Sequence, residues 1–103
     1  MNINSSISSM YAHQDLLNSS AHNIANSNTK NFERTDTRLV EGAHETVEAS
    51  YTKIENDVEN SYSNTDLAKE FTDQILSYHA VGANAVALET QGEVSGTILD
   101  IKA

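Results

Sequence analysis

The chain of 103 residues contains no cysteine, no tryptophan and no proline. Without cysteine there can be no disulfide bond, and the thiolate ligands of many structural zinc sites are missing. Small domains that lack these supports usually gain stability by oligomerisation. The apolar fraction of 38% also lies below the roughly 45–50% of an average domain. We therefore expect a thin core and a chain that depends on partners.

Positive charge is scarce as well. Fifteen acidic against six basic residues give a formal net charge of −9, and a surface of this sign repels the phosphates of nucleic acids and the headgroups of anionic lipids. No nucleic-acid partner is expected. Ten of the fifteen acids lie in residues 33–70, whereas Asp15 is the only acid or base in residues 1–29. We expect the two ends of the chain to pack against each other and against partners, and the acidic middle to be solvated.

Long apolar runs are also missing. No stretch approaches the roughly 20 apolar residues that span a bilayer, so no membrane insertion is predicted. The first nine residues, MNINSSISS, contain no basic residue, and no apolar run follows them, in contrast to a secretory signal peptide. If the protein leaves the cytoplasm, we expect it to do so without a cleaved signal of that type.

The first part of the chain has the spacing of an amphipathic helix, which we predict over residues 4–26. Asn26, Asn28 and Asn31 mark its end, because asparagine tolerates the left-handed backbone that terminates helices, and Phe32 follows as an apolar anchor. The other faces are rich in serine and asparagine, which are weak helix formers, so the helix needs a partner. The positions spaced by three and four residues, here named the N-terminal stripe, are Ile3, Ile7, Met10, Gln14, Leu17, Ala21 and Ile24.

A second helical pattern runs from residue 65 to the end. Ser63, Asn64 and Thr65 are candidate capping residues, and Asp66 and Glu70 carry the charge that a helix N-terminus favours. This helix would be about 50 Å long against about 35 Å for the first, so part of it should contact other chains. Its apolar side, here named the C-terminal stripe, consists of Leu67, Phe71, Gln74, Tyr78, Val81, Ala85, Leu88, Gly92, Ser95 and Leu99, widened by Ile75, Val86, Val94 and Ile98.

Residues 33–64, between the helices, have a mixed pattern. Val47, Ala49 and Tyr51 alternate with polar residues, as in a half-exposed strand. A helical spacing also fits Val47, Tyr51, Ile54 and Val58. We predict an extended segment or a β-hairpin.

The predicted fold is mainly α, with a coiled-coil-like antiparallel pair of long terminal helices in a single domain. Its segments are residues 1–32, 33–64 and 65–103. A compact middle brings the facing helix ends together, and equal rise along both helices then sets the register. It places Ile24 near residues 67–71, Leu17 near 74–78, Met10 near 81–85 and Ile3 near 88–92.

Two segments of this sequence resemble the bacterial flagellar axial proteins, the family of rod and hook subunits. Residues 21–32, AHNIANSNTKNF, are similar to the family motif A-x-N-I-A-N-x-x-T-x-G-[FY] after the first helix. Residues 65–75 and 83–85, with shorter matches at 90–91 and 97–101, resemble the family's C-terminal segment. The turn-motif residues are Asn23, Ile24, Ala25, Asn26, Asn28, Thr29, Asn31 and Phe32.

The resemblance implies helices that form the innermost layer of a tubular assembly around an export channel, in the periplasmic rod or proximal hook of the basal body. Its partners would be other copies or other axial proteins, and the flagellar type III export apparatus would deliver it unfolded. The sequence departs from the family at Lys30-Asn31, where Pro-Gly is usual, and at residues 79–82. Its middle is also far shorter than that of hook proteins.

Catalytic and metal-binding patterns are missing from the sequence. The four histidines lack the close spacing of a structural metal site, and there is neither a glycine-rich phosphate loop nor a G-x-S-x-G motif. We expect no enzyme activity and no cofactor. The competing function is a monomeric helical-hairpin adaptor or chaperone-like module. The histidines are His13, His22, His44 and His79.

Overall fold

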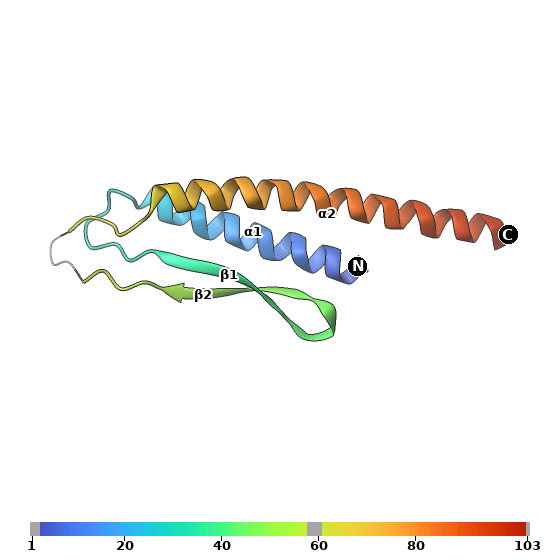
Figure 1. Ribbon diagram of the computed structural model, residues 1–103, viewed down its shortest axis with the longest axis horizontal. Coiled ribbons are helices and arrows are strands. Elements are labelled where there is room, and N and C mark those ends of the chain that lie inside the picture. Colours follow the sequence, from blue (N-terminus) through green and yellow to red (C-terminus); the bar gives the residue numbers. More distant parts are fainter. Residues whose placement is uncertain (1–2, 58–60, 103) are drawn as a thin grey trace.

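A computed structural model of the protein describes residues 3–57 and 61–102, and the side chains of residues 3–57 and 61–96. The molecule is long and flat, with extents of 69 × 24 × 14 Å. Two helices and a β-hairpin lie roughly along the long axis (Figure 1). The elements are α1 (Ile3–Ala25), β1 (Thr35–Glu41), a 3₁₀ turn η1 (Ala43–Glu45), β2 (Val47–Lys53) and α2 (Leu67–Lys102).

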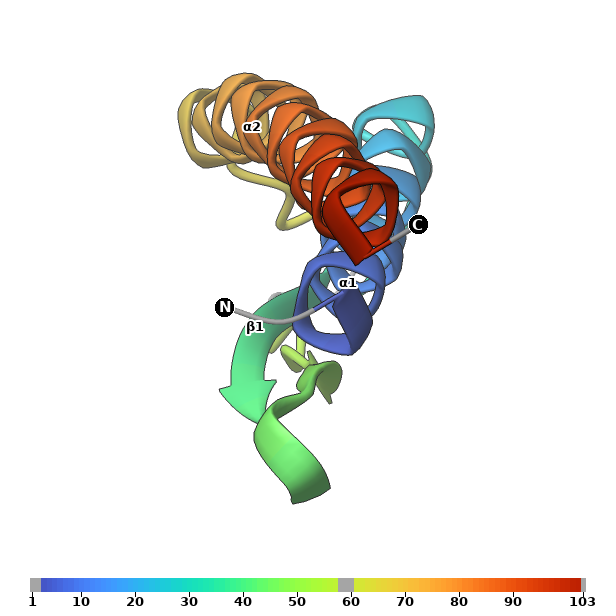
Figure 2. The same cartoon turned by 90° about the vertical axis from the view of Figure 1, so that its right-hand side faces the viewer.

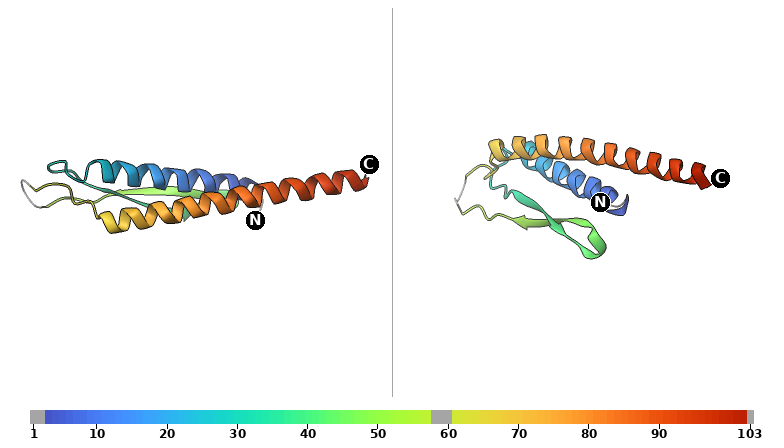
Figure 3. Two further views of the ribbon diagram at one scale, coloured as in Figure 1. Left: turned by 90° about the horizontal axis from the view of Figure 1, so that it is seen from above. Right: turned by 45° about the vertical axis from the view of Figure 1, so that its right-hand side comes forward.

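The two helices run antiparallel, and α2 continues well beyond the N-terminal end of α1 (Figures 1 and 3). Two hydrogen bonds fix how they lie against each other. Ser20 Oγ donates to the Glu70 carbonyl at 3.0 Å, and Asn84 Nδ2 donates to Ser9 Oγ at 3.0 Å. Both contacts agree with the predicted register, which placed Met10 beside residues 81–85. The antiparallel helix pair is therefore confirmed.

The centre of the contact between the helices contains small and polar side chains. The two apolar stripes therefore do not form the buried core that the predicted register would give them, and residues such as Met10 and Val81 are only half-buried. Ala12 is the only apolar residue that is buried among the described residues. Small side chains allow close approach of the helices, and hydrogen bonds pair buried polar groups such as Ser9, Ser20 and Asn84. The buried residues of the helices are Ser5, Ser6, Ser9, Ala12, Ser20 and Asn23 in α1, and Glu70, Ser77 and Asn84 in α2.

The N-terminus of α2 is capped by a residue that the sequence interpretation had assigned only a charge role. Asp66 Oδ1 accepts a bond of 3.2 Å from the backbone N–H of the third helical residue, which is the geometry of an N-cap. The three predicted capping residues make other hydrogen bonds instead. Ser63 Oγ donates to Thr65 Oγ1 at 2.6 Å, and Asn64 Oδ1 accepts from the backbone N–H of Arg34 at 2.7 Å.

The middle segment forms a two-stranded antiparallel hairpin whose register runs from Thr35 opposite Lys53 to Glu41 opposite Val47. The predicted hairpin is confirmed, and the helical alternative for the β2 segment is wrong. Both strands pack on α1, on the side away from α2 (Figures 1 and 2). The order of layers is thus α2, α1, hairpin.

The tip of the hairpin is bonded to the start of α1. The Val47 backbone N–H donates to Ser8 Oγ at 3.0 Å, and Ser5 Oγ donates to the carbonyl of Glu45. The tip itself contains two left-handed residues that are not glycine, His44 with φ 56° and Glu45 with φ 61°. Backbone of this kind usually recruits asparagine or glycine, so these two residues are locally strained.

Candidate assembly surface

Asn23, the first asparagine of the turn motif, joins three elements. It is 1% exposed, and its Nδ2 donates to the Thr35 carbonyl at 2.8 Å and to Glu70 Oε1 at 3.0 Å. Its Oδ1 accepts from the Thr35 backbone N–H at 3.0 Å. The side-chain amide thus pairs with Thr35 as a neighbouring strand would. The backbone carbonyl of Asn23 accepts from Thr65 Oγ1 at 3.0 Å. Asn23 thus bonds α1 to β1, to Thr65 just before α2 and to Glu70 in the first turn of α2.

The rest of the turn motif shapes the exit from α1. Asn26 Nδ2 donates to the His22 carbonyl at 2.9 Å, and Asn26 Oδ1 accepts from Thr29 Oγ1 at 3.0 Å. Asn31 has φ 62°, so the expected left-handed residue lies here, after the helix, and not at its end. The Phe32 ring lies edge-on to His22, with centroids 5.5 Å apart, and anchors the turn. The other motif residues are Ile24, which is half-buried, and Ala25 and Asn28, which are exposed.

Ion pairs link the hairpin to α2 next to this motif. Lys69 Nζ lies 2.7 Å from Asp73 Oδ2 and 3.9 Å from Asp36 Oδ1, and Asp36 also pairs with Arg34 Nε at 3.1 Å. Burial lowers the pKa of Lys69, but the hydrogen bond and charge of Asp73, with the charges of Asp36 and Glu70, raise it by more, so the net pKa is raised. Lys69 therefore stays charged. Two of the six basic residues are thus paired inside the chain.

A seven-residue polar repeat on α2, which the sequence interpretation missed, carries the contact with α1. Glu70, Ser77 and Asn84 are 1%, 0% and 8% exposed, and the half-buried Gln91 follows at the same spacing. A heptad period is a recognisable signal of one helix side facing a partner. Polar residues at such positions fix register and orientation, at the cost of the hydrophobic stabilisation that apolar residues would give.

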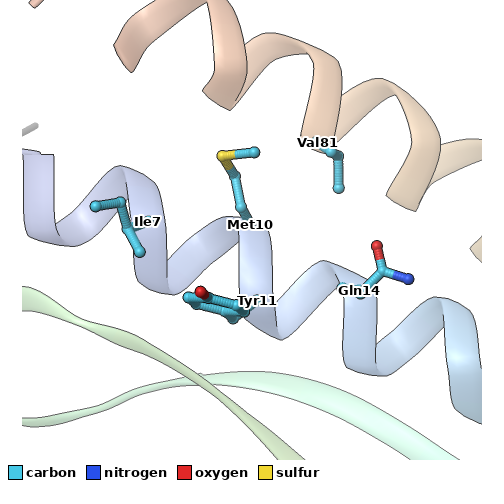
Figure 4. Close-up of a pocket in the computed structure, with 5 residues that line it drawn as sticks. All are labelled: Ile7, Met10, Tyr11, Gln14 and Val81. Atoms are coloured by element: carbon cyan, nitrogen blue, oxygen red, sulfur yellow. The ribbon is translucent and has the colours of Figure 1, made fainter.

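Parts of the two apolar stripes lie side by side between the helices, where they line what we name the apolar groove. One part of it has a volume of about 370 Å³, and the adjoining part has about 310 Å³. In Figure 4, Met10 reaches from α1 toward α2 and Val81 from α2 toward α1. The first part is lined by Ile7, Met10, Tyr11, Gln14 and Val81, and the second by Gln14, Leu17, Ser77, Tyr78, Val81 and Gly82.

Most of the predicted stripe residues are exposed, which corrects their expected place inside the helix pair. Phe71, Ile75 and Tyr78 on α2 are 52%, 60% and 74% exposed. Clusters of large exposed apolar side chains usually mark interaction sites. Ile98 and Leu99 lie in α2, but their side chains are outside the described ones. Of the others, Ile3, Ile7, Ala21, Leu67 and Ala85 are exposed, and Met10, Leu17, Ile24, Val81 and Leu88 are half-buried.

The end of α2 extends past α1. Because Asn84 contacts Ser9 and α1 begins six residues before Ser9, at Ile3, α1 can cover α2 only to about residue 90. Residues 92–102 form the overhang, about 16 Å of helix at 1.5 Å per residue. Within it, the side chain of Val94 is 53% exposed.

Among the side chains of residues 3–57 and 61–96, no group of three or more His, Asp or Glu is arranged to hold a metal ion. Neither α1 nor α2, as far as described, combines the length and apolar character that would span a membrane. No protein-family model matches the chain, and no curated protein matches it. The function is therefore inferred from the apolar groove, the overhang and the turn-motif residues.

Proposed function

We propose that the protein is a structural subunit of the bacterial flagellar rod or hook, and that its helix pair packs against other copies or other axial proteins around the export channel. The observation that carries the proposal is that the helix pair has polar residues inside and large apolar residues outside, the reverse of a usual helix pair. Polar and small residues such as Glu70 and Ser77 fill the contact within the chain, while large residues such as Phe71 and Tyr78 face outward.

The exposed apolar surface has an energetic consequence. Seven large side chains of α2 are between 43% and 74% exposed, and five of these belong to the C-terminal stripe before residue 90. Burying the exposed part of these five would contribute roughly 4–9 kcal/mol, before the costs of association. The thin polar contact within the chain gains little hydrophobic stabilisation, so association adds stability to a helix pair that hydrogen bonds already hold in place. The five stripe residues are Leu67, Phe71, Ile75, Tyr78 and Val86.

The resemblance to flagellar axial proteins agrees with the roles of the motif residues. Asn23 bonds to β1 and α2, Asn31 takes the left-handed backbone and Phe32 anchors the turn. The motif thus gives the geometry that joins the two helices. We extend the proposal to export in an unfolded state through the type III apparatus, without a cleaved signal, to the periplasmic rod or proximal hook.

Analytical ultracentrifugation of the purified full chain over a range of concentrations tests the proposal. We expect wild-type protein to assemble and Ile75→Asp to remain small while keeping its helical circular dichroism, because Ile75 is 60% exposed in the single chain. Thr90→Asp, an equally charged change at an exposed position of α2 outside the C-terminal stripe, is the control and should assemble normally.

One observation favours the alternative of a monomeric helical-hairpin adaptor or chaperone-like module. The bonds Ser20–Glu70 and Asn84–Ser9 fix the helix pair within a single chain, as a self-contained module would require. Such a module would remain a folded monomer at every concentration. That result, with Ile75→Asp indistinguishable from wild type, would reject the subunit proposal.

A further inference from the structure

The apolar groove and the overhang are two incompletely covered surfaces at different places on the chain. We infer that the overhang of one copy, residues 92–102 of α2, lies in the apolar groove of the next copy. The inference rests on the proposed function and specifies which surfaces meet.

The two surfaces match in length. Along α1 the groove extends from Ile7 to Leu17, which is eleven residues or about 16 Å of helix. The overhang is also eleven residues, and about 16 Å, long by the same measure. One overhang therefore fills one groove from end to end.

The chemistry of the two surfaces also matches. The groove is lined by apolar and uncharged side chains, and the overhang carries only Glu93, Asp100 and Lys102 as charged residues. Val94, Ile98 and Ile101 follow the spacing i, i+4, i+7 in the sequence, which is the pattern of a helix that enters an apolar groove. The acidic hairpin segment, in contrast, would repel its own copy.

An overhang cannot enter the groove of its own chain. Val94 is thirteen residues beyond Val81 on the same continuous helix, which separates them by about 20 Å. The contact must join two chains, and it uses a different surface on each. Such a head-to-tail contact leaves one groove and one overhang free at the two ends of the assembly. When the rotation between neighbouring copies does not close a ring, further copies add and an open filament forms.

Cysteine crosslinking on the full-length chain tests the inference cleanly, because the protein has no cysteine of its own. Gln14→Cys in the groove is mixed with an affinity-tagged Val94→Cys under mild oxidation. Each chain then carries one cysteine, so every crosslink joins two molecules. We expect the mixed pair to dominate over both self-pairs. Asp15→Cys, exposed and outside the groove lining, replaces Gln14→Cys as the control and should give background yield.

Gly82 provides a second, independent variant. A Cβ built at Gly82 meets nothing within 4 Å, so Gly82→Leu fits the single chain but fills the groove. We expect it to weaken assembly and the mixed crosslink by about tenfold or more, the factor that corresponds to losing the burial of one large side chain. Ala83→Leu, exposed and outside the groove lining, is the matched control and should leave both unchanged.

The outcomes separate this inference from the proposed function. Dominant Gln14–Gln14 crosslinks would mean that two grooves face each other and would overturn the inference, as would normal assembly with the mixed pair at background yield. In both cases the subunit proposal would stand. A chain that remains monomeric and forms no crosslink would reject the inference and the proposed function together.

Discussion

Replacing Asn23 by alanine is the sharpest test of how the fold is held together. The substitution removes two neutral hydrogen bonds, of 2.8 and 3.0 Å, to the backbone of Thr35. It also removes the bond of 3.0 Å to the Glu70 carboxylate, which is 1% exposed. Neutral bonds contribute about 1 kcal/mol each and a bond to a charged group about 2 kcal/mol. The expected loss is therefore about 4 kcal/mol.

That loss is comparable to the whole stability of a marginal domain, about 5 kcal/mol. Urea unfolding followed by circular dichroism should give Asn23→Ala a much lower midpoint, with amide exchange accelerated in α1, β1 and the start of α2 together. Asn26→Ala is the matched control, because its bonds to His22 and Thr29 are exposed, and it should lose less than about 1 kcal/mol. An Asn23→Ala protein within about 0.5 kcal/mol of wild type would refute the reasoning.

Three further predictions concern the hairpin tip, an ion pair and export. His44→Asn with Glu45→Gly should raise the melting temperature, because each left-handed residue costs roughly 1–2 kcal/mol; an unchanged or lower temperature would contradict the strain at this tip. The raised pKa of Lys69 means that its charge stabilises the fold below the unfolded-state value of 10.5. That contribution is lost as the pH rises through the folded pKa, so Lys69→Met should be less stable than wild type at pH 7, and this difference should shrink in alkaline urea titrations. Deleting residues 2–20 should keep the protein inside the cell in a secretion assay, and normal secretion of the truncated chain would argue against a type III signal there.

The sequence predicted the helices, their antiparallel register and the hairpin, because each follows from periodicity and from chain length between elements. The side of each helix that faces the other could not be predicted in this way. Apolar positions such as Phe71 were assigned to the contact because burial usually favours them, whereas the contact holds Ser77 and Asn84. A pattern of apolar residues shows which side of a helix favours burial. It does not show whether the other helix of the same chain or another subunit covers that side.

The polar contact between the two helices could not be predicted from the sequence for a related reason. Ser9 and Ser20 are weak helix formers outside the N-terminal stripe, yet each has a partner on α2. Their burial depends on pairing across 75 and 50 residues of sequence, which no local rule detects. The role of Asn23 is similar, because the motif indicated a turn, while its bond to Glu70 exists only in the folded chain.

Electron cryo-microscopy of isolated flagellar basal bodies tests most directly whether the chain builds part of the axial structure. We expect density for the antiparallel pair of α1 and α2 in the inner layer of the rod or proximal hook, with Phe71, Ile75 and Tyr78 against neighbouring subunits. A complete axial structure from which this chain is absent, with the protein found only as a free monomer, would contradict it.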